Sequence, residues 1–236
     1  MSQDSAFPLT LMEAGFRIIP GKEAEFFEVQ NRMVPIGMSQ PGFVAVYGGP
    51  IAASDWLYFS VRFASPQEMH AWHGQRGHQA VQRMAYEKFW TAMYIRKWQR
   101  AADGAAAGDR LLCETRIERE TPLSNNESGA LHAALGRLGE FGTKPFETLT
   151  GQYEAQPCQF VGPLEIAPAA APVSYALVTH WSSTADIARW RESAPYRAIE
   201  ALGRVATETF VPYVEPEERL NLRQDRLQRD WTLETH

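Results

Sequence analysis

The chain has little cysteine, no long apolar run and no excess of basic residues. Its two cysteines, Cys113 and Cys158, lie far apart and form no CxxC motif, so we expect two free thiols in the cytoplasm. Basic residues number 23 against 28 acidic ones, a net charge of −5, whereas nucleic-acid binding favours a basic surface. No stretch approaches the roughly 18 to 20 apolar residues of a membrane span, and the first ten residues do not resemble a signal peptide. We therefore expect neither nucleic-acid nor membrane partners.

Apolar residues, by contrast, make up 44 % of the 236 residues. This content supports one large domain or two small ones with packed cores. Apolar periodicity in the first 100 residues predicts strands at 9–19, 43–47, 56–63 and 92–98, and helices at 22–38 and 65–90. The second helix is expected to be interrupted at Gly74 and Gly77. The order β-α-β-β-α-β is that of a ferredoxin-like unit.

Prolines and glycines set the expected ends of these elements. Pro35 is expected to stop or kink the first helix, and residues 48–50, GGP, to end the second strand. Ser65 and Pro66 form a typical helix start, with serine as the N-cap and proline at the first helical position.

A second series of elements follows residues 101–109, AADGAAAGD, which we interpret as a linker. The patterns predict strands at 110–119, 146–153, 175–181 and 210–214, and a Pro/Ala-rich loop at 157–173. They also predict a helix at 128–141 and a broken helix at 184–207, with the break at Pro195. A constant shift of 118 residues places Trp72 on Trp190 and His78 on Tyr196. We therefore expect a tandem repeat, with a first domain at 1–100, a diverged second domain at 110–215 and a charged tail at 216–236.

Three motifs in the first half carry a family resemblance. They are PGKE after the first strand, PGF after the first helix, and a second helix whose Trp72 is followed by His78. In these motifs the chain resembles the antibiotic biosynthesis monooxygenase (ABM) domain of the dimeric α/β-barrel superfamily. The second half keeps the Trp190 and Tyr196 pair but lacks the PGKE and PGF motifs.

The resemblance implies how the two halves pack. A four-stranded ferredoxin-like sheet carries helices on one face, so its other face needs cover. We therefore expect an α+β protein in which two ferredoxin-like domains in tandem pack their sheets together as an intra-chain dimeric α/β barrel. Each half would keep a ligand pocket between its helices and its sheet. A homodimer of the two-domain chain is a further expectation.

The resemblance also implies a chemistry for the histidine-rich stretch at 69–80, MHAWHGQRGHQA. Members of the family oxidise electron-rich phenols or anthrones without metal or flavin, which requires a base, a polar anchor and a dry aromatic pocket. The small hydrophobic or aromatic substrate would meet candidate catalytic residues His78, Trp72, Tyr196 and Trp190. Candidate substrate-binding residues are Tyr47, Tyr58, Arg62, His180 and Trp181.

Four alternatives stay open at this point. Haem could bind through a histidine of this helix, as in haem-degrading relatives. A mononuclear metal could bind to His70, His73 and His78, as the resemblance to sulfur oxygenase reductases suggests. The protein could also bind its ligand without turning it over. Finally, Trp72 and Trp190 could be plain core anchors, with His78 and Tyr196 as surface residues.

Overall fold

The computed structural model describes residues 9–101, 110–144, 158–162 and 173–219, the last with side chains through residue 213. The first half contains β1 (Thr10–Ile18), α1 (Glu23–Met38), β2 (Phe43–Pro50), β3 (Trp56–Phe63), α2 (Pro66–His73), α3 (Arg76–Lys88) and β4 (Trp90–Arg100). The second half contains β5 (Leu111–Arg119), α4 (Asn125–Leu135), the short 3-10 helix η1 (Leu138–Phe141), β6 (Thr143–Lys144), β7 (Cys158–Val161), β8 (Val173–Trp181), α5 (Thr184–Arg191), α6 (Ala194–Glu200) and β9 (Arg204–Arg219).

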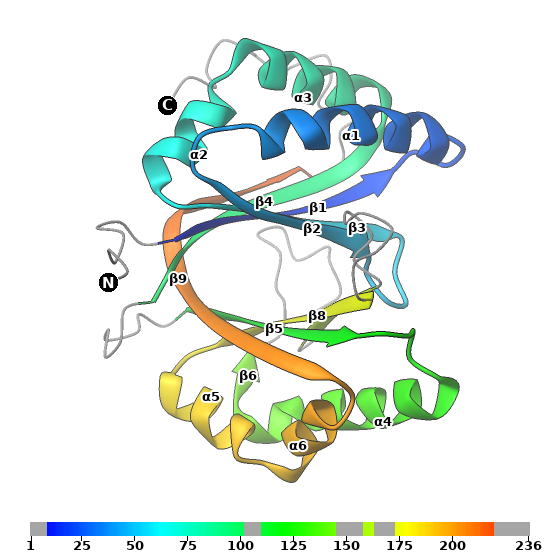
Figure 1. Cartoon of the computed structure of the whole chain (residues 1–236), viewed down its shortest axis with the longest axis vertical. Coiled ribbons are helices and arrows are strands. Elements are labelled where there is room, and N and C mark those ends of the chain that lie inside the picture. The colour runs from blue at the N-terminus through cyan, green and yellow to red at the C-terminus, as the bar shows by residue number, and fades with distance from the viewer. Residues whose placement is uncertain (1–8, 102–109, 145–157, 163–172, 220–236) are drawn as a thin grey trace.

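The strands form one large antiparallel sheet, which makes this an α+β protein. Its order is β2-β3-β1-β4-β9-β5-β8-β6, and β7 also pairs with β8. Figure 1 shows α1, α2 and α3 covering the outer face of the first-half strands and α4, α5 and α6 covering that of the second half. The inner faces of the two sets of strands lie opposite each other. Within the described ranges, no helix is long and apolar enough to cross a membrane.

The long strand β9 joins the two halves. Up to Phe210 it pairs with β5, and from Phe210 onward it pairs with β4. On the opposite side, Ile51 forms a bridge with Val161, and the amide of Ala52 donates to the carbonyl of Phe160 at 2.8 Å. The two free edges of the sheet, β2 and β7, therefore meet at that point.

Several expectations about single elements are confirmed, and others are wrong. Strand β3 and the Ser65 N-cap, whose side chain accepts from the Glu68 amide, lie where they were predicted. Pro35, however, lies inside α1, which continues to Met38. Proline there removes only one helical hydrogen bond near the end of the helix. Strand β2 also continues through Gly48, Gly49 and Pro50, because an edge strand tolerates a missing donor.

The larger errors fall in the second half. The expected loop at 157–173 contains strand β7. The break in the expected helix at 184–207 is confirmed, since α5 and α6 are separate helices, but the break comes before Ala194 rather than at Pro195 and α6 ends at Glu200, before β9 begins. Strand β9 spans Arg204–Arg219 rather than 210–214, because β-branched residues such as Val205 and Thr207 favour a strand that two neighbours can pair. The predicted strand at 146–153, the linker at 102–109 and the tail from 220 lie outside the described residues.

Three hydrophobic clusters fill the molecule. One lies between α1–α3 and the first-half strands, a second lies between α4–α6 and the second-half strands, and the third lies between the two sets of strands. The third cluster is bordered by buried charged side chains, which include Glu13, Arg62, Arg96 and Glu114. The molecule thus has two apolar helix–sheet layers and one mixed layer between the sheets.

Candidate functional site

A cavity of about 80 Å³ lies in the first helix–sheet layer. Strands contribute apolar side chains to its floor, among them Phe16 and Phe59. Its helical wall carries Trp72 from α2 and His78 from α3, together with apolar residues of α1. One water needs about 10–15 Å³ on this measure. The cavity therefore has room for a small molecule of several heavy atoms.

The break between α2 and α3 places two of the predicted residues side by side. On a continuous helix, residues six apart point to different sides, because each residue turns the chain by about 100°. Here α2 ends at His73, and Gln75 adopts an extended backbone before α3 begins. The rings of Trp72 and His78 consequently lie 4.1 Å apart between centroids, inclined by 56°. The expected interruption at Gly74 is confirmed, because α2 ends there, whereas the one at Gly77 is wrong, since that residue lies inside α3.

The imidazole of His78 is the chemically distinctive group of the cavity. Its Nε2 atom is buried and has no hydrogen-bond partner within the described part of the chain. Burial lowers the pKa of His78 to about 4, so the ring is neutral at neutral pH. A buried polar atom without a partner costs about 1–3 kcal/mol. A ligand that hydrogen-bonds to Nε2 would recover that energy, and the neutral ring could also accept a proton from it.

The three histidines proposed as metal ligands are not brought together. His73 is half-buried with its Nε2 atom 2.9 Å from the sulfur of Met12, and its ring lies 5.2 Å from that of His78. Burial and then the neighbouring His78 lower the pKa of His73 to about 3. His70 instead contacts the ring of Tyr213 at 5.6 Å. In the described ranges no group of three histidine, cysteine or acidic side chains could hold a metal ion.

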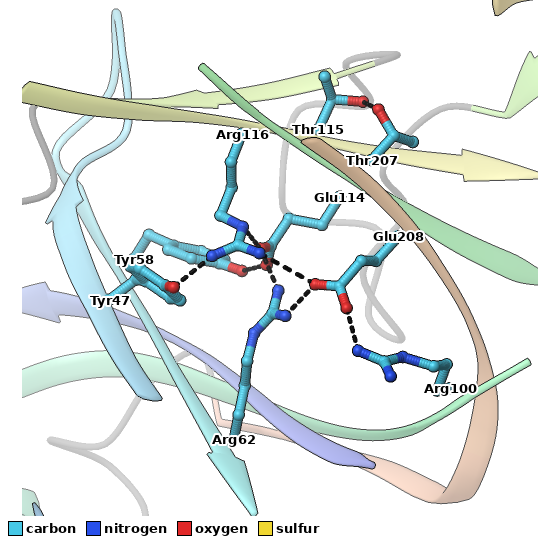
Figure 2. Close-up of polar contacts among 9 residues, drawn as sticks. All are labelled: Tyr47, Tyr58, Arg62, Arg100, Glu114, Thr115, Arg116, Thr207 and Glu208. Atoms are coloured by element: carbon cyan, nitrogen blue, oxygen red, sulfur yellow. Dashed lines mark hydrogen bonds and ion pairs between the residues drawn. The ribbon is translucent and has the colours of Figure 1, made fainter. Parts of the chain in front are cut away.

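The equivalent pair in the second half has a different environment. Trp190 and Tyr196 lie 5.8 Å apart between ring centroids, in an edge-on arrangement. The hydroxyl of Tyr196 lies 2.8 Å from that of Thr207, which lies 3.1 Å from the hydroxyl of Thr115. Figure 2 shows the two threonines reaching toward each other from neighbouring strands. The polar atom of this pair therefore already has a protein partner.

The predicted substrate-binding residues Tyr47, Tyr58 and Arg62 lie between the sheets rather than at the cavity. Figure 2 shows Arg62 of β3 forming ion pairs with Glu114 of β5 and Glu208 of β9. The hydroxyl of Tyr58 donates to Glu114 at 3.1 Å. Both charged partners of Arg62 come from the second half, so these contacts connect the halves.

The same cluster includes two more arginines. Arg116 contacts the hydroxyl of Tyr47 and lies 3.2 Å from Glu208, which also pairs with Arg100. We call Arg62, Arg100, Glu114, Arg116 and Glu208 the inter-sheet charge cluster. Its buried charges are paired, as buried charges must be to avoid a large desolvation cost. Its geometry indicates a connection between sheets rather than a ligand pocket.

His180 and Trp181 lie on opposite faces of β8, as adjacent strand residues do. His180 is buried between the sheets, 5.7 Å from the ring of Trp98, and burial holds its pKa well below the usual value. Trp181 is buried on the helix side, and its indole donates to the hydroxyl of Thr179 at 2.9 Å. Neither residue lines the first-half cavity.

Sequence reasoning missed several polar residues that the structure makes prominent. Glu13 is fully buried, accepts a hydrogen bond from the Trp98 indole at 2.9 Å, and has its pKa raised by burial to about 7. Gln30 and Gln82 line the cavity. Helical spacing could have identified Gln82, because it follows His78 by four residues and therefore lies on the same face of the helix.

No protein-family model matches the chain, and no curated protein matches its sequence significantly. Solved structures do match it. An aldoxime dehydratase in complex with butyraldoxime has a TM-score of 0.54 and 11 % identity, over 90 % of this chain and 81 % of that one. A second crystal structure of aldoxime dehydratase has a TM-score of 0.52 and 11 % identity, over 86 % and 80 %.

A third match is a ferredoxin-fold protein related to antibiotic biosynthesis monooxygenases, from Listeria monocytogenes. It covers 86 % of this chain and 95 % of its own, at 10 % identity and a TM-score of 0.31, a score too low to carry an argument. At 11 % identity the two aldoxime dehydratase matches show the fold alone. The chain therefore shares the fold of the two aldoxime dehydratase structures, and monooxygenase-related ferredoxin-fold proteins are among its structural neighbours.

Proposed function

We propose that the protein is an ABM-type monooxygenase that needs no bound cofactor and oxidises a small aromatic substrate in the cavity beside His78. The observation that carries the proposal is His78 in the lining of a largely apolar cavity, with a buried Nε2 that has no partner among the described residues. We further propose that residues 1–100 and 110–215 are tandem ferredoxin-like domains whose sheets form an intra-chain barrel. The meeting of β2 with β7 supports that arrangement.

The chemistry needs a proton acceptor and a dry pocket. A single-ring aromatic substrate with an activated CH₂ group loses a proton to Nε2 of His78 and becomes an electron-rich anion. The anion supplies the electrons that reduce O₂, so the CH₂ carbon becomes a carbonyl and the second oxygen atom leaves as water. The low pKa of His78 means that its protonated form is stable only beside the substrate anion. Proton transfer is thereby coupled to substrate binding, and Trp72 helps to exclude water.

A haem-binding function is the second candidate, because Nε2 of His78 is a free imidazole nitrogen of the kind that ligates haem iron. A porphyrin, however, needs far more space than about 80 Å³, and its two propionates need cationic or polar partners. Neither lysine nor arginine lines the cavity among the described residues. The residues present therefore do not fit haem in this conformation.

Oxygen uptake separates the monooxygenase from a protein that only binds its ligand. With single-ring phenolic and activated-CH₂ substrates, the wild-type protein should consume one O₂ for each carbonyl formed. His78→Ala should lower that rate at least 100-fold, in the range typical of lost acid–base catalysis. Tyr196→Phe is the matched control and should keep most of the rate, because Tyr196 lies in the other half.

Two results would overturn the proposal. Saturable binding of these compounds without oxygen uptake would indicate a binding protein. Equal rates for wild type and His78→Ala would remove the role of His78. A Soret band that titrates with haemin and shifts in His78→Ala would favour the haem protein instead.

A further inference from the structure

We infer that Gln30 and Gln82 recognise a second polar group of the ligand, so that the preferred ligand carries two oxygens at opposite ends of one small ring. This inference deepens the proposed function and rests on it only in placing the ligand in the same cavity. It names a substrate class, a para-disubstituted oxygenated aromatic ring, and two residues that determine specificity.

The imidazole and amide side chains of the cavity come from the helices. Apart from the indoles of Trp72 and of Trp90 from β4, the polar side chains among its described lining residues are His78 and Gln82 from α3 and Gln30 from α1. On the sheet side, Phe16 and Trp90 stack at 4.3 Å between centroids. The cavity therefore has one polar wall and one aromatic floor. A ligand that fits it has a flat apolar face and a polar edge.

The spacing along α3 sets the distance between the polar groups of that edge. His78 and Gln82 lie four residues apart, and Val81 and Ala85 of the same helix also line the cavity. Residues four apart on a helix share a face and are separated by about 6 Å along the axis. Two oxygens across a single aromatic ring match this separation better than two adjacent oxygens do.

The two glutamine amides are available for a ligand. Within the described ranges, no side-chain hydrogen bond of Gln30 or Gln82 is found. Both are half-buried, and an amide side chain offers one acceptor oxygen and two donor hydrogens. An apolar ligand would strip water from these amides without replacing it, whereas a hydroxyl or carbonyl oxygen would hydrogen-bond to them.

Anaerobic binding measurements with three small ligands test the inference. The probes are hydroquinone, with para oxygens, catechol, with adjacent oxygens, and p-cresol, in which a methyl group replaces the second oxygen. Wild-type protein should bind hydroquinone about threefold to tenfold more tightly than the other two, as expected for one hydrogen bond. Calorimetry under argon measures the three dissociation constants.

The variants Gln82→Met and Gln30→Met keep the side-chain length and remove the amide. At least one of them should bind hydroquinone and p-cresol equally, with p-cresol affinity unchanged. Gln79→Met is the matched control, because Gln79 lies on the outer surface of α3 and does not line the cavity. Thermal melting checks that each variant is folded.

Survival of the hydroquinone preference in both Gln30→Met and Gln82→Met would overturn the inference, as would its absence in the wild type. The failure of the proposed function looks different. Loss of selectivity in the glutamine variants, without any oxygen uptake by the wild type, would keep the specificity residues and reject the monooxygenase. Oxygen uptake by the wild type, together with an unchanged preference for hydroquinone in both glutamine variants, would keep the monooxygenase and reject the specificity residues.

Discussion

The two halves of the molecule carry a similar pair of helices, but the polar atom of the second ring has a protein partner in only one of them. In each half a serine N-cap, Ser65 or Ser183, begins a helix that carries a tryptophan, and a second helix then carries a ring six residues after it. The ring of Tyr196 is hydrogen-bonded through Thr207 to the sheet. The ring of His78 faces a cavity, and its Nε2 atom has no partner among the described residues.

The comparison shows that contact between two rings does not by itself identify a site. Both pairs lie within 6 Å between centroids. What differs is whether the polar atom of the second ring is satisfied by the protein. A satisfied hydroxyl stabilises the fold, whereas an unsatisfied buried nitrogen is tolerated at an energetic cost. We therefore assign a structural role to the second pair and a ligand-binding role to the first.

Replacing each tryptophan by alanine should give the largest difference between the halves. Trp190→Ala should lower the free energy of unfolding by about 3–5 kcal/mol, the usual cost of removing a fully packed large side chain. Trp72→Ala should cost less, because part of its ring already faces the cavity rather than packed atoms. Urea unfolding monitored by circular dichroism measures both. An equal or larger loss in Trp72→Ala would contradict the assignment.

Acid should destabilise the first half through its buried histidines. The folded-state pKa of His78 is about 4, below the 6.5 of the unfolded chain, so the stability it contributes is complete above pH 6.5 and is lost as the pH falls toward 4. As the pH falls from 7 to 4, the free energy of unfolding of His78→Gln should therefore rise by about 3 kcal/mol relative to that of the wild type. Parallel pH series of urea midpoints measure this gain.

Glu13 acts in the opposite direction and serves as an internal check. Its folded-state pKa of about 7 lies above the unfolded value, so its contribution favours folding at low pH and is lost as the pH rises from about 4.5 to 7. Because Glu13 is present in both proteins, its effect cancels in the comparison of His78→Gln with wild type. A pH-independent difference between the two would show that His78 is not buried as the structure places it.

The smallest effect should come from the hydroxyl of Tyr196. Tyr196→Phe removes the hydrogen bond to Thr207 but leaves Thr207 paired with Thr115, so about 1 kcal/mol should be lost. Thr207→Val should cost more, because it leaves the hydroxyls of both Tyr196 and Thr115 without this partner. Thermal melting orders the three proteins. A Tyr196→Phe variant as stable as wild type would remove the structural role given to this ring.

The sequence predicts the local elements of the first half well, because apolar periodicity and capping residues act over short distances. The Ser65 N-cap and strand β3 follow directly from such signals. Strands β7 and β9 do not, because their extents depend on partners far away in the chain. A four-residue strand in a Pro/Ala-rich segment has no local signal strong enough to mark it.

The candidate site could be predicted only in part. The Trp72 and His78 pair was visible as a repeated spacing, and the helix break at Gln75 makes it a contact. The direction in which Tyr58, Arg62 and His180 point could not be predicted. Alternation along a strand defines two faces but does not show which face the helices cover. Charged strand residues such as Glu114 and Arg116 resemble solvent-exposed ones until two sheets are seen to face each other.

The most direct test of the central assignment is a titration of the protein with hydroquinone under argon, followed by NMR of the histidine and tyrosine side chains. His78→Gln assigns the His78 resonances by their disappearance, and Tyr196→Phe does the same for Tyr196. We predict a saturable shift of the His78 Nε2 resonance while the Tyr196 ring signals stay unchanged. A saturable shift at Tyr196 with His78 unmoved would place the binding site in the wrong half and contradict the account.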